Sequence, residues 1–294
     1  MQQEVARQLA TLSQPQRSYV LGMIGASLLR DWYEGGEEQA ARFSDLVAAV
    51  RVLDQASSAP DESPVEVSVN DGYSEWADSY DQPNAMIQAE ESTVRSLLLK
   101  RIRPGSAILD AGCGTGRHAV WLTARGFRAI GIDRTEAMLR HATTSAPRTP
   151  FVQADIETLP ISSDSVDAAV CSLALCHFPD LGPALRELAR VLRPGGHLIV
   201  SDPHGRAAYA GGQGFYGVGG LARRRFIRNY YRQASEWIQG FTESGFAVES
   251  CHEPRMDAAA ARAHPIAGYF PDAALAALLG VPHLWIWSVI RRHD

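Results

Sequence analysis

The stretch "AILDAGCGTGRHAVWL" (Ala107–Leu122) passes from a strand-like apolar run through a glycine-rich turn into a helix-like pattern. Gly112, Gly114 and Gly116 lie at the junction, where a backbone must turn tightly and approach a ligand closely. The pattern is GxGxG, and Arg117 stands where the dinucleotide fingerprint GxGxxG has its third glycine. This departure raises the question of which ligand the loop binds.

Asp110 precedes the first glycine by two residues, and its charge bears on that question. An ionised carboxylate beside the loop would repel a pyrophosphate but suits a ligand that carries an ammonium group. The N–H groups of the loop can still bind an anion such as a carboxylate. A ligand with both groups is an amino acid.

Two further carboxylates are expected to follow neighbouring strands. Asp133 lies about 20 residues after the first glycine, where an acidic side chain accepts hydrogen bonds from ribose hydroxyls. This feature is shared by NAD and S-adenosylmethionine (SAM). Asp155 follows the next strand and is placed to accept a bond from an adenine amino group. Together the three carboxylates fit an adenosine that carries an amino acid better than a dinucleotide.

Strand-like and helix-like segments alternate after residue 105. The pattern predicts strands at 106–111, 127–133, 150–155, 165–173 and 197–204, with helices at 117–126, 135–144 and 181–196, and two further strands in "GFAVESCHE" and "HLWIWSVIRR". Such alternation predicts a Rossmann-like α/β fold, with a mostly parallel seven-stranded sheet and helices on both faces. Ligands in these folds lie at the carboxyl ends of the strands.

Five ordered motifs resemble those of class I SAM-dependent methyltransferases, of the ubiquinone/menaquinone-biosynthesis and natural-product type. They are "ILDAGCGTGRHA", "GIDRTEAML", "QADIETLPISSDSVDAAV", "LALCHFPD" and "ARVLRPGGHLIVSDP". The resemblance covers roughly residues 80–246 and implies SAM as cofactor and S-adenosylhomocysteine (SAH) as product. It leaves the N-terminal helices and the segment after Pro203 unexplained.

The resemblance also implies roles for individual residues. Asp110, Gly112 and Gly114 would line the methionine part of SAM, Asp133 the ribose, and Asp155 with Ile156 the adenine. Tyr73 and Tyr80, in "GYSEWADSYDQP", resemble the aromatic residues that such enzymes place over the methionine end. Packing of one helix on the sheet is the alternative explanation for both tyrosines.

Composition restricts the class of partner. The net charge of −5 argues against broad attraction to nucleic acid or to an anionic membrane, and favours a small-molecule partner. The four cysteines form no CxxC pair and no ligand-like cluster with histidine, so we expect reduced thiols and no metal site. The start of the chain lacks the pattern of a secretory signal, and we expect a cytoplasmic protein.

Three regions are predicted along the chain. Residues 1–55 are expected to form a helical extension. Apolar residues recur there at helix spacing, first Val20, Leu21, Ile24, Leu28 and Leu29, and then Phe43, Leu46, Val47 and Val50. Residues 56–72 are rich in Ser, Pro and acid and form a linker. Residues 73–294 form the methyltransferase domain, which begins with a helix from Tyr73 to about Arg101. The N-terminal helices cover the main domain or join two subunits of a homo-oligomer.

Candidate chemistry lies after the fourth and fifth strands. His177 and His204 are expected on the rim where the methyl group points, where an imidazole can accept a proton near neutral pH. The alternative for His177 is a structural hydrogen bond to a neighbouring loop, and the alternative for His204 is to cap a turn. Residues 205–232 are predicted to form a lid over the acceptor, with an aromatic wall of Tyr209, Phe215, Tyr216, Tyr230 and Tyr231. A surface loop whose aromatic residues fill a local core is the alternative.

The sequence therefore favours a SAM-dependent methyltransferase that acts on a small molecule, with a secondary metabolite as acceptor and oxygen favoured over carbon or nitrogen. Three alternatives remain at this stage. A nucleic-acid methyltransferase would share the cofactor half, but "LALCHFPD" lacks the [ND]-P-P-[YF] pattern of base methylation. A NAD-dependent oxidoreductase would need phosphate beside Asp110. A SAM-fold protein could bind the cofactor without transferring methyl.

Overall fold

The chain divides into two compact units in a computed structural model that describes residues 3–10, 12, 14–30, 32–33, 35–55, 64–82, 84–210, 213–216 and 225–293. The sheet unit comprises residues 67–205, 227–254 and 283–294, and the helical unit comprises residues 1–66, 206–226 and 255–282. These boundaries differ from the three consecutive regions expected from the sequence, because each unit draws on separated parts of the chain.

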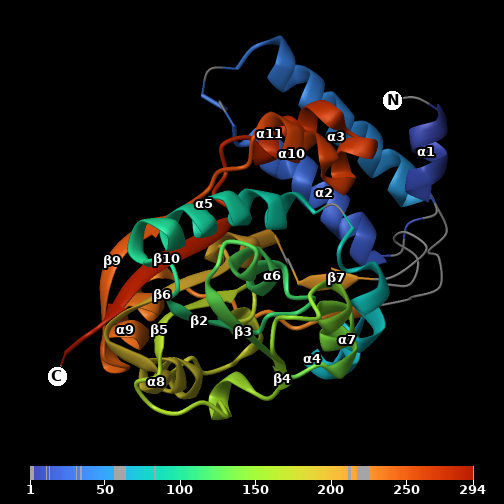
Figure 1. Cartoon of the computed structure of the whole chain (residues 1–294). Coiled ribbons are helices and arrows are strands. Elements are labelled where there is room, and N and C mark those ends of the chain that lie inside the picture. The colour runs from blue at the N-terminus through green and yellow to red at the C-terminus, as the bar shows by residue number, and fades with distance from the viewer. Residues whose placement is uncertain are drawn as a thin grey trace. The chain divides into compact units, whose positions relative to one another are not determined.

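The sheet unit is built on a seven-stranded sheet in the order β4-β3-β2-β5-β6-β10-β9 (Figure 1). The neighbours β2–β3, β3–β4, β2–β5 and β5–β6 are parallel, whereas β10 runs antiparallel to both β6 and β9. The predicted α/β fold class is confirmed. The strands are β2 (Ala107–Ala111), β3 (Arg128–Asp133), β4 (Phe151–Gln153), β5 (Val166–Ser172), β6 (Leu192–Pro203), β9 (Phe246–His252) and β10 (Leu284–Arg291).

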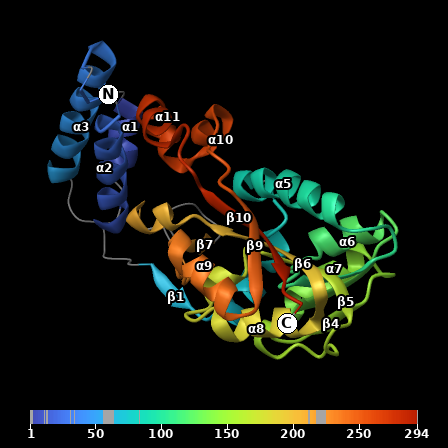
Figure 2. The same ribbon diagram turned by 90° about the vertical axis from the view of Figure 1, so that its left-hand side faces the viewer.

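Helices cover both faces of this sheet, as Figures 1 and 2 show. Buried residues of α5 (Ala85–Arg101) and α6 (Arg117–Thr123) pack on one face. Those of α8 (Gly182–Val191) and α9 (Ala234–Glu243) pack on the other, where Trp285 and Trp287 stack with ring centroids 5.6 Å apart. α7 (Glu136–Ser145) packs beside β3 and β4. Both faces of the parallel strands are therefore buried, which explains their continuous apolar runs.

The expected single helix from Tyr73 to Arg101 is interrupted. α4 (Val69–Trp76) continues into the 3₁₀ helix η1 (Ala77–Ser79), and α5 begins anew at Ala85. Asn84 ends the break, because its side-chain oxygen accepts the N–H groups of Met86 and Ile87 as a helix cap. The polar turn "YDQPN" contained this signal.

Part of the segment expected to be a linker is regular structure. Residues 64–72 include β1 (Val65–Val67) and the start of α4, which Ser68 caps by accepting the N–H of Asp71 at 3.1 Å. Residues 56–63 lie outside the described part of the chain. A short polar cap preceding an apolar residue is hard to distinguish from a loop by composition.

The helical unit joins the N-terminal helices to an insertion between β9 and β10. It contains α1 (Gln3–Ala10), α2 (Gln14–Leu28), α3 (Glu37–Gln55), α10 (Ala258–Ala263), the 3₁₀ helix η6 (Pro265–Gly268) and α11 (Pro271–Leu278). Tyr19 on α2 bonds His264 at 3.1 Å, and the Arg30 guanidinium donates to the carbonyls of Ala276 and Leu279 at the end of α11. The insertion thus covers an apolar face of α2.

The apolar stripe expected on α3 is only partly buried. Ala49 and Leu53 are buried, whereas Phe43 and Val50 are exposed. Leu46 packs against the same core, and Leu29, just after α2, is exposed. Only part of each periodic apolar set is therefore covered in the helical unit.

The expected lid is described in part. Residues 205–232 include the 3₁₀ helix η4 (Gly205–Ala210) and the short strands β7 (Gly214–Tyr216) and β8 (Arg225–Ile227), while residues 211–212 and 217–224 lie outside the described part. β1, β8 and β7 form a small sheet in that order. Among the described helices, none has the length and apolar character needed to cross a membrane.

Candidate cofactor and acceptor site

The site lies where the order of the sheet reverses. β2 is flanked by β3 on one side and β5 on the other, so the segments that follow β2 and β5 diverge at their carboxyl ends. The glycine loop follows β2, Asp133 ends β3, and the 3₁₀ helices η2 (Ile156–Thr158) and η3 (Leu175–His177) follow β4 and β5. The predicted cofactor residues therefore converge on one edge.

The glycine loop is held by a carboxylate. Gly112 and Gly114 have φ of 69° and 54°, a region that glycine adopts without strain. A side chain at Gly112 would place its Cβ 2.7 Å from that of Ala174, so the close approach of the chain segments requires glycine. Asp133 accepts the N–H of Gly114 and that of Thr135, each at 2.8 Å. These bonds oppose the effect of burial, which raises the pKa of Asp133.

A cavity of about 60 Å³ lies at this edge. It is lined by the predicted residues Tyr73, Tyr80, Gly112, Asp133, Asp155, Ile156 and His177, together with Val69, Arg134, Thr135, Ala154, Ser172, Leu173, Ala174 and Phe178. The lining fits an adenosyl amino acid, because it combines two carboxylates, which accept hydrogen bonds, with the backbone of a glycine. The volume is below the roughly 300–1,000 Å³ of ligand pockets, so binding of a cofactor requires the cavity to widen.

Tyr73 and His177 form a hydrogen-bonded pair on the cavity wall. His177 Nδ1 lies 3.0 Å from the carbonyl oxygen of Arg228, which only accepts, so Nδ1 carries the proton. His177 Nε2 then accepts the phenol of Tyr73 at 2.8 Å. Burial lowers the pKa of His177, in agreement with this neutral form. The structure therefore shows both nitrogens of His177 in structural hydrogen bonds, the alternative that the sequence left open.

Asp110 and Gly114 do not line this cavity. The Asp110 carboxylate is 1% exposed and accepts the N–H of Ala119, in the first turn of α6, at 2.8 Å. Burial raises the pKa of Asp110, and the charge of His118 and the bond from Ala119 oppose that effect. The expected contact of Asp110 with a ligand ammonium stays a prediction. Asp110 instead fixes the helix that follows the glycine loop.

His204 is not among the residues that line the cavity. It is 7% exposed, its Nε2 lies 3.0 Å from Glu253, and its ring stacks on Trp285 with centroids 3.9 Å apart. These contacts support the structural alternative to its expected catalytic role. A histidine after a strand has no sequence signal that distinguishes the two.

The five aromatic residues expected around the methyl acceptor differ in their burial and in the unit to which they belong. Tyr230 is 38% exposed and donates its backbone N–H to the Cys176 carbonyl, and Tyr231 is half-buried with a hydrogen bond from Asn229 to its hydroxyl. Tyr216 is buried and belongs to the helical unit. The side chains of Tyr209 and Phe215 lie outside the described part of the structure. An aromatic wall formed by all five stays a prediction.

Glu90 is a site residue that the sequence analysis missed. This carboxylate on α5 is fully buried and accepts hydrogen bonds from Arg117 at 2.5 Å, Ser172 at 2.6 Å and Ser201 at 2.8 Å, with His118 Nε2 at 3.3 Å. Burial raises the pKa of Glu90, but the charges and hydrogen bonds of His118 and Arg117 outweigh it and lower that pKa far below its ordinary value. The sequence did contain a signal for this residue, because the spacing places Glu90 on the same face of the helix as the apolar Val94 and Leu97.

The Glu90 contacts also explain the departure from the dinucleotide fingerprint. Arg117 takes the place of the third glycine, and its guanidinium reaches back to Glu90. Ser172, which lines the cavity, is bound to the same carboxylate. Glu90 thus ties α5 to the glycine loop and to the ends of β5 and β6.

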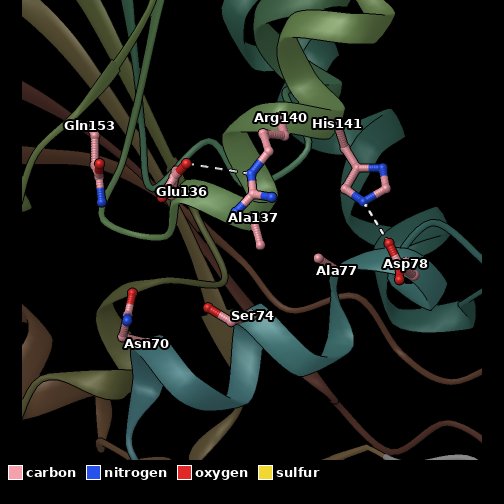
Figure 3. Close-up of a pocket in the computed structure, with 9 residues that line it drawn as sticks. All are labelled: Asn70, Ser74, Ala77, Asp78, Glu136, Ala137, Arg140, His141 and Gln153. Carbon is pink, nitrogen blue, oxygen red and sulfur yellow. Dashed lines mark hydrogen bonds and ion pairs between the residues drawn. The ribbon is translucent and has the colours of Figure 1, made fainter.

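A larger polar groove of about 550 Å³ lies beside α4 (Figure 3). Its walls are residues of α4 and η1 on one side and of α7 on the other, with the Glu136–Arg140 pair at 3.5 Å and the His141–Asp78 pair at 3.1 Å. α4 presents Asn70 and Ser74 to this groove but Val69 and Tyr73 to the cofactor cavity. This one helix therefore forms a wall of both.

Comparison with known proteins identifies the domain. A family model described as a methyltransferase domain matches residues 109–200, which run from β2 to β6. The crystal structure of a SAM-dependent methyltransferase from Mesorhizobium loti is 26% identical and superposes with a TM-score of 0.53, over 69% of this chain and 98% of that one. The sheet unit is a class I SAM-dependent methyltransferase domain. Its cofactor is SAM, as the sequence predicted.

Curated relatives agree with this assignment. Residues of this chain are 36% identical over 129 positions to a malonyl-[acyl-carrier protein] O-methyltransferase of Yersinia pestis, covering 44% of this chain and 48% of the relative. They are 32% identical over 136 positions to a demethylmenaquinone methyltransferase of Clavibacter sepedonicus, covering 44% and 56%. This chain thus spans about half the length of these relatives. The predicted resemblance to the menaquinone-type methyltransferases is confirmed.

Proposed function

We propose that the protein transfers a methyl group from SAM to a small-molecule acceptor, with oxygen as the favoured target atom. The cavity at the reversal of the sheet carries this proposal, because it combines Gly112, Asp133 and Asp155 in the order that an adenosyl amino acid requires. The relatives named above support it, since their printed names are those of methyltransferases acting on a carrier-bound malonyl group and on a quinone precursor.

We assign roles to the cavity residues on the same basis. Asp133 is proposed to bind the ribose hydroxyls through lone pairs beyond those that accept Gly114 and Thr135. Asp155 and Ile156 would bind the adenine, and Tyr73 and Tyr80 would close over the methionine end. When bound, SAM supplies an activated methyl group on a sulfonium. The chain's own contribution is then to orient the reactants and exclude water.

The acceptor and the setting of the reaction are part of the proposal. A secondary metabolite, a cytoplasmic location and a homo-oligomer formed through the N-terminal helices are all compatible with the net charge of −5 and the exposed apolar residues of α3. We propose no nucleic-acid or membrane partner. Tight, salt-sensitive binding of RNA at low salt would contradict this part.

A thermal-shift titration with SAM, SAH and NADH tests the cofactor, because a ligand of the folded state raises stability by mass action. We expect SAM and SAH to raise the melting temperature and NADH to leave it unchanged. Transfer of labelled methyl to extracted small molecules then tests the reaction. Cofactor binding with no methyl transfer to any acceptor would favour the non-transferring alternative.

A further inference from the structure

Asp202, in the "SDP" motif at the end of β6, is a buried carboxyl group that the assignments above do not use. It is 1% exposed, and neither of its oxygens has a hydrogen-bond partner among the residues that the structure describes. An unpartnered buried carboxyl costs several kcal/mol if ionised in an apolar setting. Such a group persists either because it is neutral or because a ligand completes its surroundings.

The register of the sheet places Asp202 next to the cofactor cavity. Ser201 pairs with Ser172, which lines the cavity. Ser201 points to the α5 face, where it donates to Glu90, so the next residue points to the opposite face. There Asp202 lies opposite Trp285 of β10. Asp202 therefore lies one residue beyond the Ser172–Ser201 pair that borders the cavity, and its carboxyl is on the opposite face of the sheet from Glu90.

The neighbours of this carboxyl supply charge, and the N–H and thiol of Cys176 lie near it without the distance and angle of a formed hydrogen bond. The Arg232 guanidinium is directed to the backbone, donating to the carbonyls of Leu175, Phe178 and Tyr230. Burial raises the pKa of Asp202 to about 7, although the N–H and thiol of Cys176 and the charge of Arg232 favour ionisation. The titratable groups around it are Tyr73, Cys171, Cys176, Tyr231 and Arg232.

Tyr73 connects Asp202 electrostatically to the cofactor cavity. Burial raises the pKa of the Tyr73 phenol, and the charges of both Asp133 and Asp202 add to this effect. Tyr73 and Asp133 both line the cavity, so the charge of Asp202 acts on one residue of the cavity wall.

We propose that Asp202 faces the sulfonium end of bound SAM and takes the proton that the acceptor gives up. This inference rests on the proposed function. The acceptor atom forms its bond to the methyl carbon as the bond from carbon to sulfur breaks, and SAH leaves. The acceptor proton moves to a carboxylate oxygen of Asp202, which later returns it to solvent. His177 is less suited to this role, because Tyr73 occupies its only basic nitrogen.

The proposal is testable without knowing the acceptor, because SAM carries a positive sulfonium and SAH a neutral thioether. A positive charge beside Asp202 favours its ionised form. Binding of SAM to the full-length protein at pH 7 should therefore release roughly half a proton that binding of SAH does not, since a group with a pKa of about 7 is half-protonated there. Isothermal titration in two buffers of different ionisation enthalpy measures this number.

Asp202→Asn should abolish the difference between SAM and SAH while SAH still binds. Asp164→Asn is the matched control, since Asp164 is 53% exposed at the turn before β5, pairs with Arg291, and has a φ of 53° that asparagine tolerates. It should leave the difference unchanged. An equal proton count for SAM and SAH in the wild-type protein overturns the proposal whether or not the variant folds, as does a difference that persists in Asp202→Asn. Failure of both ligands to bind would instead overturn the cofactor assignment.

Discussion

Glu90 and Asp202 are two buried carboxyl groups on opposite faces of the sheet's carboxyl edge. Ser201 donates to Glu90 at 2.8 Å, and the very next residue of β6 is Asp202, which has no partner among the described residues. Donors surround one carboxyl and lower its pKa, whereas burial dominates at the other and raises its pKa to about 7. Equal burial therefore produces a fixed charge at Glu90 and a titrating group at Asp202.

This difference indicates that Glu90 has a structural role and Asp202 a functional one. A carboxylate with satisfied oxygens stabilises a structure but has little capacity for a new proton near neutral pH. Glu90 thus holds the glycine loop through Arg117. A carboxyl with unsatisfied oxygens costs stability, and such costs are typical of functional sites. Asp202 fits the second description.

The largest expected effect is on stability at Glu90. Glu90→Ala leaves Arg117, Ser172 and Ser201 without their common acceptor, and removal of one partner of a buried ion pair costs about 3–5 kcal/mol. Urea unfolding at pH 7 measures the change in free energy of unfolding. Glu136→Gln is the control, because Glu136 is exposed and pairs with Arg140 on the same helix at 3.5 Å; we expect a loss below about 1 kcal/mol there.

The Glu90 effect should also depend on pH. Because folding lowers the pKa of Glu90 below its ordinary 4.5, its contribution is complete above that pH and is lost as the pH falls. The difference between wild type and Glu90→Ala should shrink in acid. A difference that stayed constant down to pH 3 would mean that packing, and not charge, accounts for the loss.

Asp202→Asn should raise stability at neutral to alkaline pH, whereas Glu90→Ala lowers it. Folding raises the pKa of Asp202 from 3.8 to about 7, so the unfolded chain loses this proton first and stability falls as the pH rises between these values. The variant removes that fall, which amounts to at most about 4 kcal/mol. We expect Asp202→Asn to be more stable than wild type at pH 8 and similar to it at pH 4. Unfolding curves across this range check the sign, and a destabilised variant at pH 8 would break the comparison.

The sequence predicted the part of the structure in which strands and helices alternate. The alternation after residue 105 gave the strands, the order of ligand-binding segments and the placement of Asp133 and Asp155, because these depend on local pattern and on general rules for parallel sheets. For Asp110 the sequence indicated a position beside the loop but did not show the direction of its side chain. The N–H of Ala119 decided that direction.

The missed features depend on contacts between distant parts of the chain. Glu90 and Ser201 are 111 residues apart, and no local pattern predicts that they meet. The insertion of residues 255–282 into the helical unit is similar, since Tyr19 and His264 are separated by 245 residues. For Asp202 the sequence showed an acid near the end of a strand, but only the packing of the chain shows that its oxygens are unpartnered.

The smallest effect concerns Tyr73, which lies within electrostatic reach of Asp202. Tyr73→Phe removes the hydroxyl that His177 accepts at 2.8 Å and should cost about 1 kcal/mol of unfolding free energy, the usual net value of one hydrogen bond. The proton released on SAM binding should persist in this variant, because the carboxyl of Asp202 is not bonded to the phenol. Calorimetry in two buffers measures it. Loss of the proton release would show that Asp202 has Tyr73 as a partner. Glu90 and Asp202 would then differ only in the number of their hydrogen bonds.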